Sequence, residues 1–565
     1  MITRTVLLLV VLVTALRAAV PVEVVPVSAR NGMVVAGHPE ASAAGVAVLE
    51  AGGTAVDAAV AVALSLGVAE PYGSGLGGKL MLLYFEAATG RTFAIDAMDA
   101  ADDSLEVTAY LKRPAEDRTH GYGSVAVPGL AEGLWAAHRR WGRLPWADTV
   151  APAIRLAREG FEVLPKTRDQ FVEQETKLRR GDAEIARLYL PDNRVPDVGS
   201  RLPNPDLART MEALAREGRD GFYRGPVAAA LVAASQAGGG TLSADALATY
   251  EARFVEPLGI DFRGRRIVAG PPPTHGAPLV LTLLKALENE SFDARPLRSA
   301  DHLHVIGRLW REVQPHVQQT IADAPEALFN FEKMVAPDAI AELRAKAGLT
   351  EAPAPARRVV GWDPSGFSES AQAATTHFIV ADRAGNVVCA TQSLSLHFGA
   401  GVVAPGTGVV LNNSMSNFAY TDATSINYVA PGKRPRSTIT PTLVLRDGRV
   451  QLAIGIPGAA RIPTAVFQSL LDHLVWNRPL DQAIGDTRFH FHSGWRPGDE
   501  EAFEAEQSFP ADEAARLTAL GWKVVLREPA GTGRYFGGIN AVIVHPDGSY
   551  TGYADPRRTN AAVGY

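Results

Sequence analysis

The chain has 565 residues, of which 47% are hydrophobic and 21% are charged, a composition typical of a globular protein with a large core. Its 55 basic and 61 acidic side chains give a net charge of -6, so the composition offers no electrostatic case for binding nucleic acid or an anionic membrane surface. The length predicts several domains or one large α/β unit.

The N-terminus has the pattern of a signal peptide. Arg4 supplies a positive charge, residues 6–16 form an uncharged, mostly apolar run, and small residues follow at 15–19. We therefore expect residues 1–19 to be removed from an exported protein, periplasmic or secreted; a membrane anchor or a first core strand is the alternative. No later segment is apolar for long enough to span a bilayer. Cys389 is the only cysteine, so no intrachain disulfide can form, and we expect it to pack inside a strand.

The first part of the chain alternates helical and glycine-rich segments. Residues 41–51 are alanine-rich and end at two glycines, a stop typical of a helix C-terminus. Thr54 followed by Asp57 resembles a capping box for a second helix. The glycine-rich run 71–78 contains no GKS or GKT, which favours tight backbone packing over phosphate binding, and a buried-strand pattern follows it.

The second part of the chain changes from helical to strand-like patterns. Residues 130–350 are predicted to be mostly helical and residues 350–370 to form a loop or linker. Three later pairs of strand-like runs flank turn sequences, with helical patterns between the pairs; the turns lie at residues 382–386, 447–448 and 546–548. Antiparallel strands with intervening helices predict stacked sheets covered by helices.

Thr375-Thr376-His377 stands at the junction between a soft segment and a strand-like run. Within an intact chain, a threonine there merely starts a β-strand, in which threonine is common. If the chain is cut before Thr375, one residue carries both a hydroxyl nucleophile and a free α-amine with a reference pKa near ~8. Such a residue can attack an amide carbonyl and act as its own base, which is the chemistry of an N-terminal-threonine hydrolase.

Further motifs follow one another along the whole chain; they lie at residues 57–63, 73–78, 127–129, 221–225, 271–273, 411–418, 431–441, 455–462 and 554–558. Together with Thr375-Thr376-His377 they closely resemble the γ-glutamyltransferase family of N-terminal-nucleophile hydrolases. The resemblance implies an α+β fold, a four-layer αββα sandwich. It also implies a proenzyme that cuts its own Ala374–Thr375 bond. The products would be a large chain, residues 20–374, and a small chain, residues 375–565, which stay associated.

The resemblance assigns catalytic roles within the small chain. Thr375 would form an acyl-enzyme, and Ser393 stands where the family has a threonine that hydrogen-bonds the nucleophile. Gly458 and Ala459 match the two oxyanion-hole residues. Because the donor is a backbone N–H, alanine in the second position need not abolish it.

The resemblance also assigns substrate-binding roles. Ser437 and Thr438 match the family's paired hydroxyls that hold the substrate carboxylate. Arg436, beside them, is a candidate for a substitute carboxylate clamp, since arginine grips carboxylates through two hydrogen bonds; a solvated loop residue is the alternative. The segment between Phe418 and Lys433 is short for the family, which predicts that no lid covers the site.

The residues that read a γ-glutamyl head group in the family are replaced in this chain. Met98 stands in place of an arginine for the α-carboxylate, and Asn417 in place of an aspartate for the α-ammonium. Ser395 replaces an asparagine, and Ser414 replaces a glutamine or glutamate. Without both ionic partners, the site loses the basis for binding a zwitterionic head group.

We therefore expect an amidohydrolase or acyltransferase that acts on a γ-glutamyl-like or other carboxylated acyl amide, with water, an amine or an amino acid as acceptor. A cephalosporin-acylase-like amidase is the alternative among enzymes, and a catalytically silent binding protein is the alternative of another class. No cofactor and no metal are expected, because the 13 histidines show no metal-ligand spacing. His490 and His492, which alternate on a predicted strand, are expected to be structural.

Overall fold

The computed structural model describes residues 22–292, 295–349, 373–493, 501–527 and 535–565. The predicted signal peptide and the predicted linker at 350–370 lie outside the described residues. Among the helices described, none is long and apolar enough to cross a membrane.

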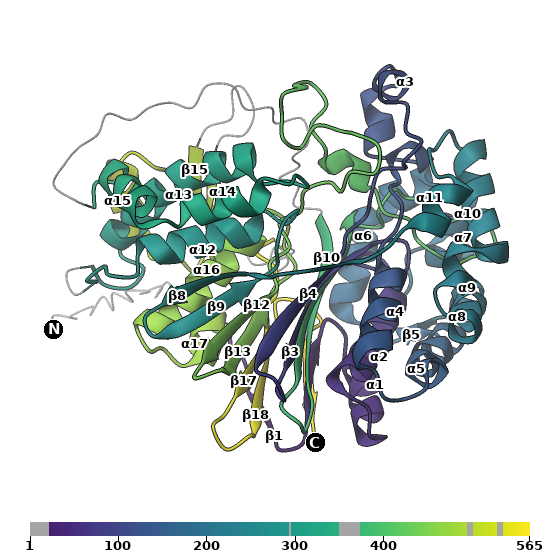
Figure 1. Cartoon of the computed structure of the whole chain (residues 1–565), viewed down its shortest axis with the longest axis horizontal. Coiled ribbons are helices and arrows are strands. Elements are labelled where there is room, and N and C mark those ends of the chain that lie inside the picture. The colour runs from purple at the N-terminus through teal and green to yellow at the C-terminus, as the bar shows by residue number, and fades with distance from the viewer. Residues whose placement is uncertain (1–21, 293–294, 350–372, 494–500, 528–534) are drawn as a thin grey trace, which may run out of the picture.

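Two seven-stranded sheets lie face to face, and helices cover the outer side of each sheet (Figure 1). The order of the first sheet is β1 (Val27–Ala29), β18 (Tyr550–Ala554), β17 (Asn540–Val544), β13 (Arg449–Gly455), β12 (Thr442–Arg446), β9 (Arg265–Ala269) and β8 (Leu258–Phe262). The order of the second is β19 (Ala561–Gly564), β2 (Met33–Ala36), β10 (Ala373–Ala381), β11 (Val387–Leu396), β3 (Lys79–Glu86), β4 (Arg91–Ala97) and β7 (Arg253–Val255). The predicted αββα sandwich is confirmed, and so are the three predicted antiparallel hairpins, β10–β11, β12–β13 and β17–β18.

The helices form the two outer layers (Figure 1). On the side of the second sheet lie α1 (Pro39–Glu50), α2 (Ala55–Ala69), α4 (Leu130–Trp141), α5 (Trp146–Glu159), α6 (Pro165–Arg180), α7 (Ala183–Tyr189), α8 (Pro205–Glu217), α9 (Asp220–Tyr223), α10 (Gly225–Ala237) and α11 (Ala244–Thr249). On the side of the first sheet lie α12 (Gly276–Ala286), α13 (Ala300–Thr320), α14 (Ala327–Met334), α15 (Pro337–Lys346), α16 (Arg461–Val475) and α17 (Leu480–Gly485). The remaining elements are α3 (Val107–Leu111), α18 (Ala511–Ala519), the sheet β14 (Phe489–Ser493), β15 (Glu501–Glu506) and β16 (Lys523–Arg527), and the pair β5 (Phe161–Glu162) and β6 (Arg201–Leu202).

Successive side chains along each strand point to opposite faces of the sheet, which produces separate hydrophobic cores between the layers. On β10, Phe378 and Val380 join the core under the helices, whereas Ile379 and Ala381 join the core between the sheets. Cys389 of β11 is buried in that same inter-sheet core, where burial raises the pKa of its thiol to about 12. Because both faces of these strands are covered, the start of β10 is held in a rigid setting.

Helix α2 illustrates how the sequence specifies this packing. The predicted capping box is present: the Thr54 side chain accepts from the Asp57 N–H, and the Asp57 carboxylate accepts from the Thr54 N–H at 2.8 Å. Every residue from Ala55 to Ala69 is buried, as expected of a helix that is apolar all round. It packs against β10 and β11, the strands that carry Thr375 and Ser393.

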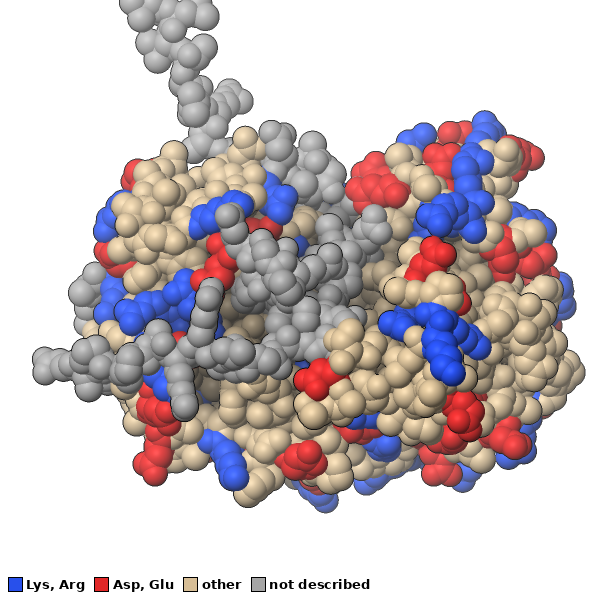
Figure 2. Space-filling view, turned by 90° about the horizontal axis from the view of Figure 1, so that it is seen from above, with Lys and Arg blue, Asp and Glu red and all other residues tan. Residues whose placement is uncertain are grey.

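Charged side chains of both signs are interspersed on the face shown in Figure 2, outside the part drawn in grey. This mixture agrees with the small net charge and gives that face no single-sign patch.

Candidate active site

Thr375 lies at the start of β10, where its hydroxyl touches the peptide bond that precedes it. Thr375 Oγ1 donates to the carbonyl oxygen of Ala374 at 2.7 Å and lies 3.1 Å from Ser393 Oγ. Ser393 Oγ also donates to the Ala374 carbonyl. Two hydroxyls thus converge on one buried carbonyl. This carbonyl belongs to the Ala374–Thr375 bond, which the sequence predicts to be cut. Arg558 Nη1 donates to the Thr375 carbonyl at 3.2 Å and fixes the other side of the residue.

The pairing of β10 with β11 is irregular at this point. Ala374 pairs with Ser395 and Thr376 with Gln392, so Thr375 faces two residues of β11, Ser393 and Leu394. Such a bulge turns a side chain out of the regular ladder and is common beside active sites. Here it lets the Ser393 hydroxyl reach back to the Ala374 carbonyl.

The glycine-rich loop 71–78 packs against these strands, as predicted. A Cβ on Gly78 would overlap the Ser393 carbonyl oxygen, and one on Gly77 would overlap that of Val410. Only glycine permits both approaches. The loop therefore brings the first residue of β3, Lys79, into register with Ser393.

The predicted oxyanion-hole residues lie between β13 and α16. The end of β13 is close to β10, because a Cβ on Gly455 would overlap the His377 ring. Ala459 has a φ of 54°, and α16 begins two residues later, so the N–H groups of this turn lie at a helix N-terminus. The positive φ accounts for glycine as the residue expected at this position, and Ala459 is strained there.

Replacing Ala459 by glycine is expected to stabilise the protein by about 1 kcal/mol, because glycine adopts this backbone conformation without strain. Activity should remain within a few-fold, since the N–H donor is retained. Thermal unfolding and amidase assays check both. Ala465→Gly, inside α16, is the matched control and should instead destabilise by about 1 kcal/mol. A lower melting temperature for Ala459→Gly would contradict the assignment.

Ser437 and Thr438 lie on an extended segment beside Pro273. Ser437 N–H donates to the Pro273 carbonyl at 3.3 Å, and the Ser437 carbonyl accepts from His275 N–H at 2.9 Å. Arg436 is buried and donates through Nη1 to the Gln318 carbonyl of α13, so the alternative that it is a solvated loop residue is wrong. Its role as a carboxylate clamp stays a prediction.

Three of the four residues predicted to replace head-group ligands come together, because hydrogen bonds fasten residues 412–414 to the glycine loop and to β11. Asn412 Nδ2 donates to the Gly77 carbonyl at 2.8 Å, and Asn413 Oδ1 accepts from Leu396 N–H at 2.9 Å. Ser414 then starts a short 3-10 helix that ends at Asn417. As a result Ser395 Oγ lies 2.8 Å from Ser414 Oγ and accepts from Asn417 Nδ2 at 3.1 Å.

A buried lysine at this cluster was not singled out from the sequence. Lys79 Nζ donates to Ser395 Oγ at 2.5 Å and to Ser414 Oγ at 2.7 Å, and it lies 3.5 Å from Asp99 Oδ2. Burial lowers the pKa of Lys79, although Asp99 raises it, and burial raises the pKa of Asp99 to about 6, although Lys79 lowers it. The sequence feature that could have pointed to Lys79 is its place as a single cation between two glycines and the apolar run 80–85. Met98, in contrast, packs in the core on the side of the first sheet.

A family model described as Gamma-glutamyltranspeptidase matches residues 41–565. The chain belongs to this family. The "Acylase ACY 1 proenzyme" of Pseudomonas sp. (strain SE83) is 35% identical over 542 residues, which cover 94% of this chain and 92% of that protein. The "Glutathione hydrolase proenzyme" of Bacillus subtilis (strain 168) is 29% identical over 555 residues, or 95% and 92% of the two chains. The crystal structure of cephalosporin acylase from Bacillus halodurans has a TM-score of 0.84 and 26% identity, and covers 98% of this chain and 99% of its own.

Membership of the γ-glutamyltranspeptidase family confirms the resemblance predicted from the sequence. It supports an autoprocessed amidohydrolase or acyltransferase, since the relatives are proenzymes of that kind.

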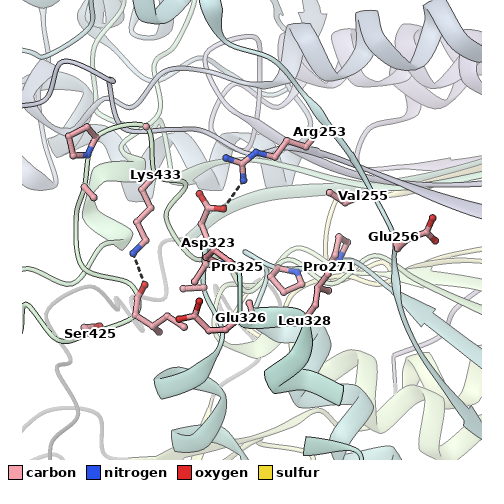
Figure 3. Close-up of a pocket in the computed structure, with 18 residues that line it drawn as sticks. Arg253, Val255, Glu256, Pro271, Asp323, Pro325, Glu326, Leu328, Ser425 and Lys433 are labelled. Atoms are coloured by element: carbon pink, nitrogen blue, oxygen red, sulfur yellow. Dashed lines mark hydrogen bonds and ion pairs between the residues drawn. The ribbon is translucent and has the colours of Figure 1, made fainter. Parts of the chain in front are cut away.

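An open cleft of about 840 Å³ lies beside the segment that leads to Ser437 (Figure 3). Residues 425–426 and 430–433 form one wall and residues 322–328 the other. Arg253 Nη1 pairs with Asp323 Oδ1 at 2.7 Å, and Lys433 Nζ donates to the Ile426 carbonyl at 2.6 Å. Residues between Phe418 and Lys433 thus border an open space. None of the predicted catalytic side chains lines this cleft.

Within the described ranges there is no group of three or more His, Cys, Asp or Glu side chains that could hold a metal ion. His490 lies on β14 with its Nδ1 2.6 Å from Thr464 Oγ1, a contact that orients the ring against α16.

Proposed function

We propose that this chain is an N-terminal-threonine amidase that cuts itself before Thr375 and then transfers acyl groups through that residue. The observation that carries the proposal is the Ala374 carbonyl, which accepts from both the Thr375 and the Ser393 hydroxyls. These contacts place a hydroxyl nucleophile beside the carbonyl carbon of the Ala374–Thr375 bond.

The proposed self-cleavage uses these contacts. Thr375 Oγ1 attacks the carbonyl carbon of Ala374, and the hydroxyl proton passes to the nitrogen of the Ala374–Thr375 bond as that bond breaks. The Ser393 hydroxyl stabilises the negative charge that develops on the carbonyl oxygen. Water then hydrolyses the ester, which releases the Ala374 carboxylate and frees both the hydroxyl and the α-amine of Thr375. The large chain would end at Ala374 and the small chain would begin at Thr375.

Turnover uses the same groups in the cut protein. The free α-amine takes the hydroxyl proton as Thr375 attacks a substrate amide, and the N–H groups of Gly458 and Ala459 bind the oxyanion. The leaving amine takes the proton, and water or a second amine then accepts the acyl group from Thr375.

The substrate class that fits best is an acyl amide with a terminal carboxylate. Ser395, Ser414 and Asn417 form a cluster of neutral, hydrogen-bonded side chains, none of which offers an ionic partner to an α-ammonium group. Ser437, Thr438 and Arg436 remain candidates for binding the carboxylate. A cephalosporin-acylase-like amidase is the second candidate, favoured by the acylase relatives. An exported location, with residues 1–19 as the leader, remains part of the proposal.

Denaturing electrophoresis of the purified protein tests the proposal. We expect two bands, and N-terminal sequencing of the smaller one should begin Thr-Thr-His-Phe. Incubation with an acyl anilide, followed by acid quenching, should add the acyl mass to the peptide that begins at Thr375. A single uncut band in protein that turns over substrate would refute the mechanism, and an uncut protein without turnover would favour the binding-protein alternative.

A further inference from the structure

Lys79 is a buried cation one strand away from the proposed nucleophile. It pairs with Ser393 in the β3–β11 ladder, and Ser393 contacts Thr375. Only 1% of the Lys79 side chain is exposed, so its ammonium group must be satisfied within the protein. Lys79 follows the glycine loop directly, and the tight packing of that loop on Ser393 holds Lys79 beside β11.

The hydrogen bonds around Lys79 have a fixed direction. An ammonium group can only donate, so both Ser395 Oγ and Ser414 Oγ accept from Lys79. Ser414 uses its one proton to donate to Asp99 Oδ2, which leaves Ser395 as the donor in the Ser395–Ser414 contact. Protons therefore point inward along the chain of bonds from Asn417 through Ser395 and Ser414 to Asp99.

Lys79 and Asp99, the two charged groups of this network, differ in how closely they are linked to its partly exposed end at Asn417. Asp99 is fully buried at the inner end, whereas Asn417 is partly exposed at the outer end. Lys79 contacts Ser395, the residue that Asn417 touches, whereas Asp99 is linked to Ser395 only through Ser414 and Lys79. A group that enters beside Asn417 and Ser395 is thus one hydroxyl away from a positive charge and further from the negative one.

We propose that Lys79 selects the acyl group, by attracting an acyl chain that ends in an anion and repelling one that carries an ammonium group. This proposal rests on the function proposed above. The favoured substrates are monoamides of dicarboxylic acids, such as glutaryl amides. Their free carboxylate would accept a hydrogen bond from the second N–H of the Asn417 amide while remaining close to the Lys79 ammonium. In a medium of reduced dielectric, one charge at this distance changes binding far more than it does in water.

The test compares glutaryl, butyryl and γ-glutamyl p-nitroanilides, which present an anion, no charge and a zwitterion. In Lys79→Met, kcat/KM for the glutaryl substrate should fall about ten- to a hundredfold, a change expected when one partly desolvated charge is removed. The butyryl value should change by less than about threefold, and the γ-glutamyl value should hold or rise, as a neutral side chain no longer repels the ammonium.

Two further variants keep the test decisive. Lys79→Met combined with Asp99→Asn removes both charges and leaves no unpaired carboxylate, so it covers the case in which the single variant does not fold. Lys177→Met is the matched control. Lys177 is a partly buried lysine that donates to the backbone carbonyls of His397, at 2.7 Å, and Gly399, rather than to Ser395 or Ser414. The Lys177→Met variant should change kcat/KM for all three substrates by the same factor.

An unchanged ratio of glutaryl to butyryl activity in both Lys79 variants would overturn the proposal. So would a wild-type enzyme that is cut at Thr375 and hydrolyses butyryl anilide with no preference for glutaryl anilide, while the proposed function would stand. Wild-type protein that is neither cut nor active on any anilide would overturn the proposed function and the role of Lys79 with it.

Discussion

Replacing Thr375 by alanine is expected to give a single uncut chain with no measurable amidase activity. In the proposed mechanism one hydroxyl performs both attacks, first on the Ala374 carbonyl that it touches at 2.7 Å and then on substrate. Removal of a catalytic nucleophile typically lowers kcat by roughly 10⁴-fold or more. Thr375→Ser keeps the hydroxyl and the amine and should retain part of both reactions. Electrophoresis and an anilide assay measure the two effects together.

Thr376→Val is the matched control for this experiment. Thr376 is the neighbouring buried threonine, and its Oγ1 has no hydrogen-bond partner among the described residues, so valine replaces it with almost the same shape and no lost bond. Cleavage and turnover should persist in Thr376→Val. If instead Thr376→Val were inactive and Thr375→Ala active, the nucleophile would lie one residue further along the chain.

Most of the fold could be predicted because its signals are local. The capping box at Thr54, the hairpin turns and the strand-like run after Thr375 each depend on a few neighbouring residues. What the sequence could not show is how distant segments meet. The strands β8 and β9 lie within a region of mostly helical pattern, and they join the first sheet only through pairing of β9 with β12, about 175 residues later.

The site was predicted less completely, for a related reason. Ser395, Ser414 and Asn417 were predicted as neutral substitutes, and the structure brings them into contact. Lys79 stayed unseen because the two serines that accept from it lie more than 300 residues away, and a lysine at the start of a strand normally points into water. Arg436 shows the opposite case: its neighbour Ser437 made it a candidate clamp, but its side chain reaches the Gln318 carbonyl on α13.

The wild-type enzyme is expected to cleave glutaryl anilide far better than γ-glutamyl anilide. The resemblance predicts that Met98 and Asn417 stand where the family binds the α-carboxylate and the α-ammonium. Each hydrogen bond to a charged group is typically worth ~1.5–3 kcal/mol. If the two contributions add, losing both hydrogen bonds weakens the preference for the glutamyl head group by roughly two to four orders of magnitude. The measurement is the ratio of kcat/KM for the two anilides at one pH.

Asn417→Asp provides the reverse test of the same argument. The new carboxylate would lie beside Ser395 Oγ, which accepts from Asn417 at 3.1 Å, and would supply the missing partner for an α-ammonium. It should raise kcat/KM for the γ-glutamyl substrate about tenfold, the effect of one charge-assisted hydrogen bond, and lower it for the glutaryl substrate by repulsion. Part of the gain should be lost to Lys79, which would attract the new carboxylate through Ser395. A wild-type enzyme that strongly prefers γ-glutamyl anilide, and that Asn417→Asp leaves unchanged, would mean that other side chains bind the head group.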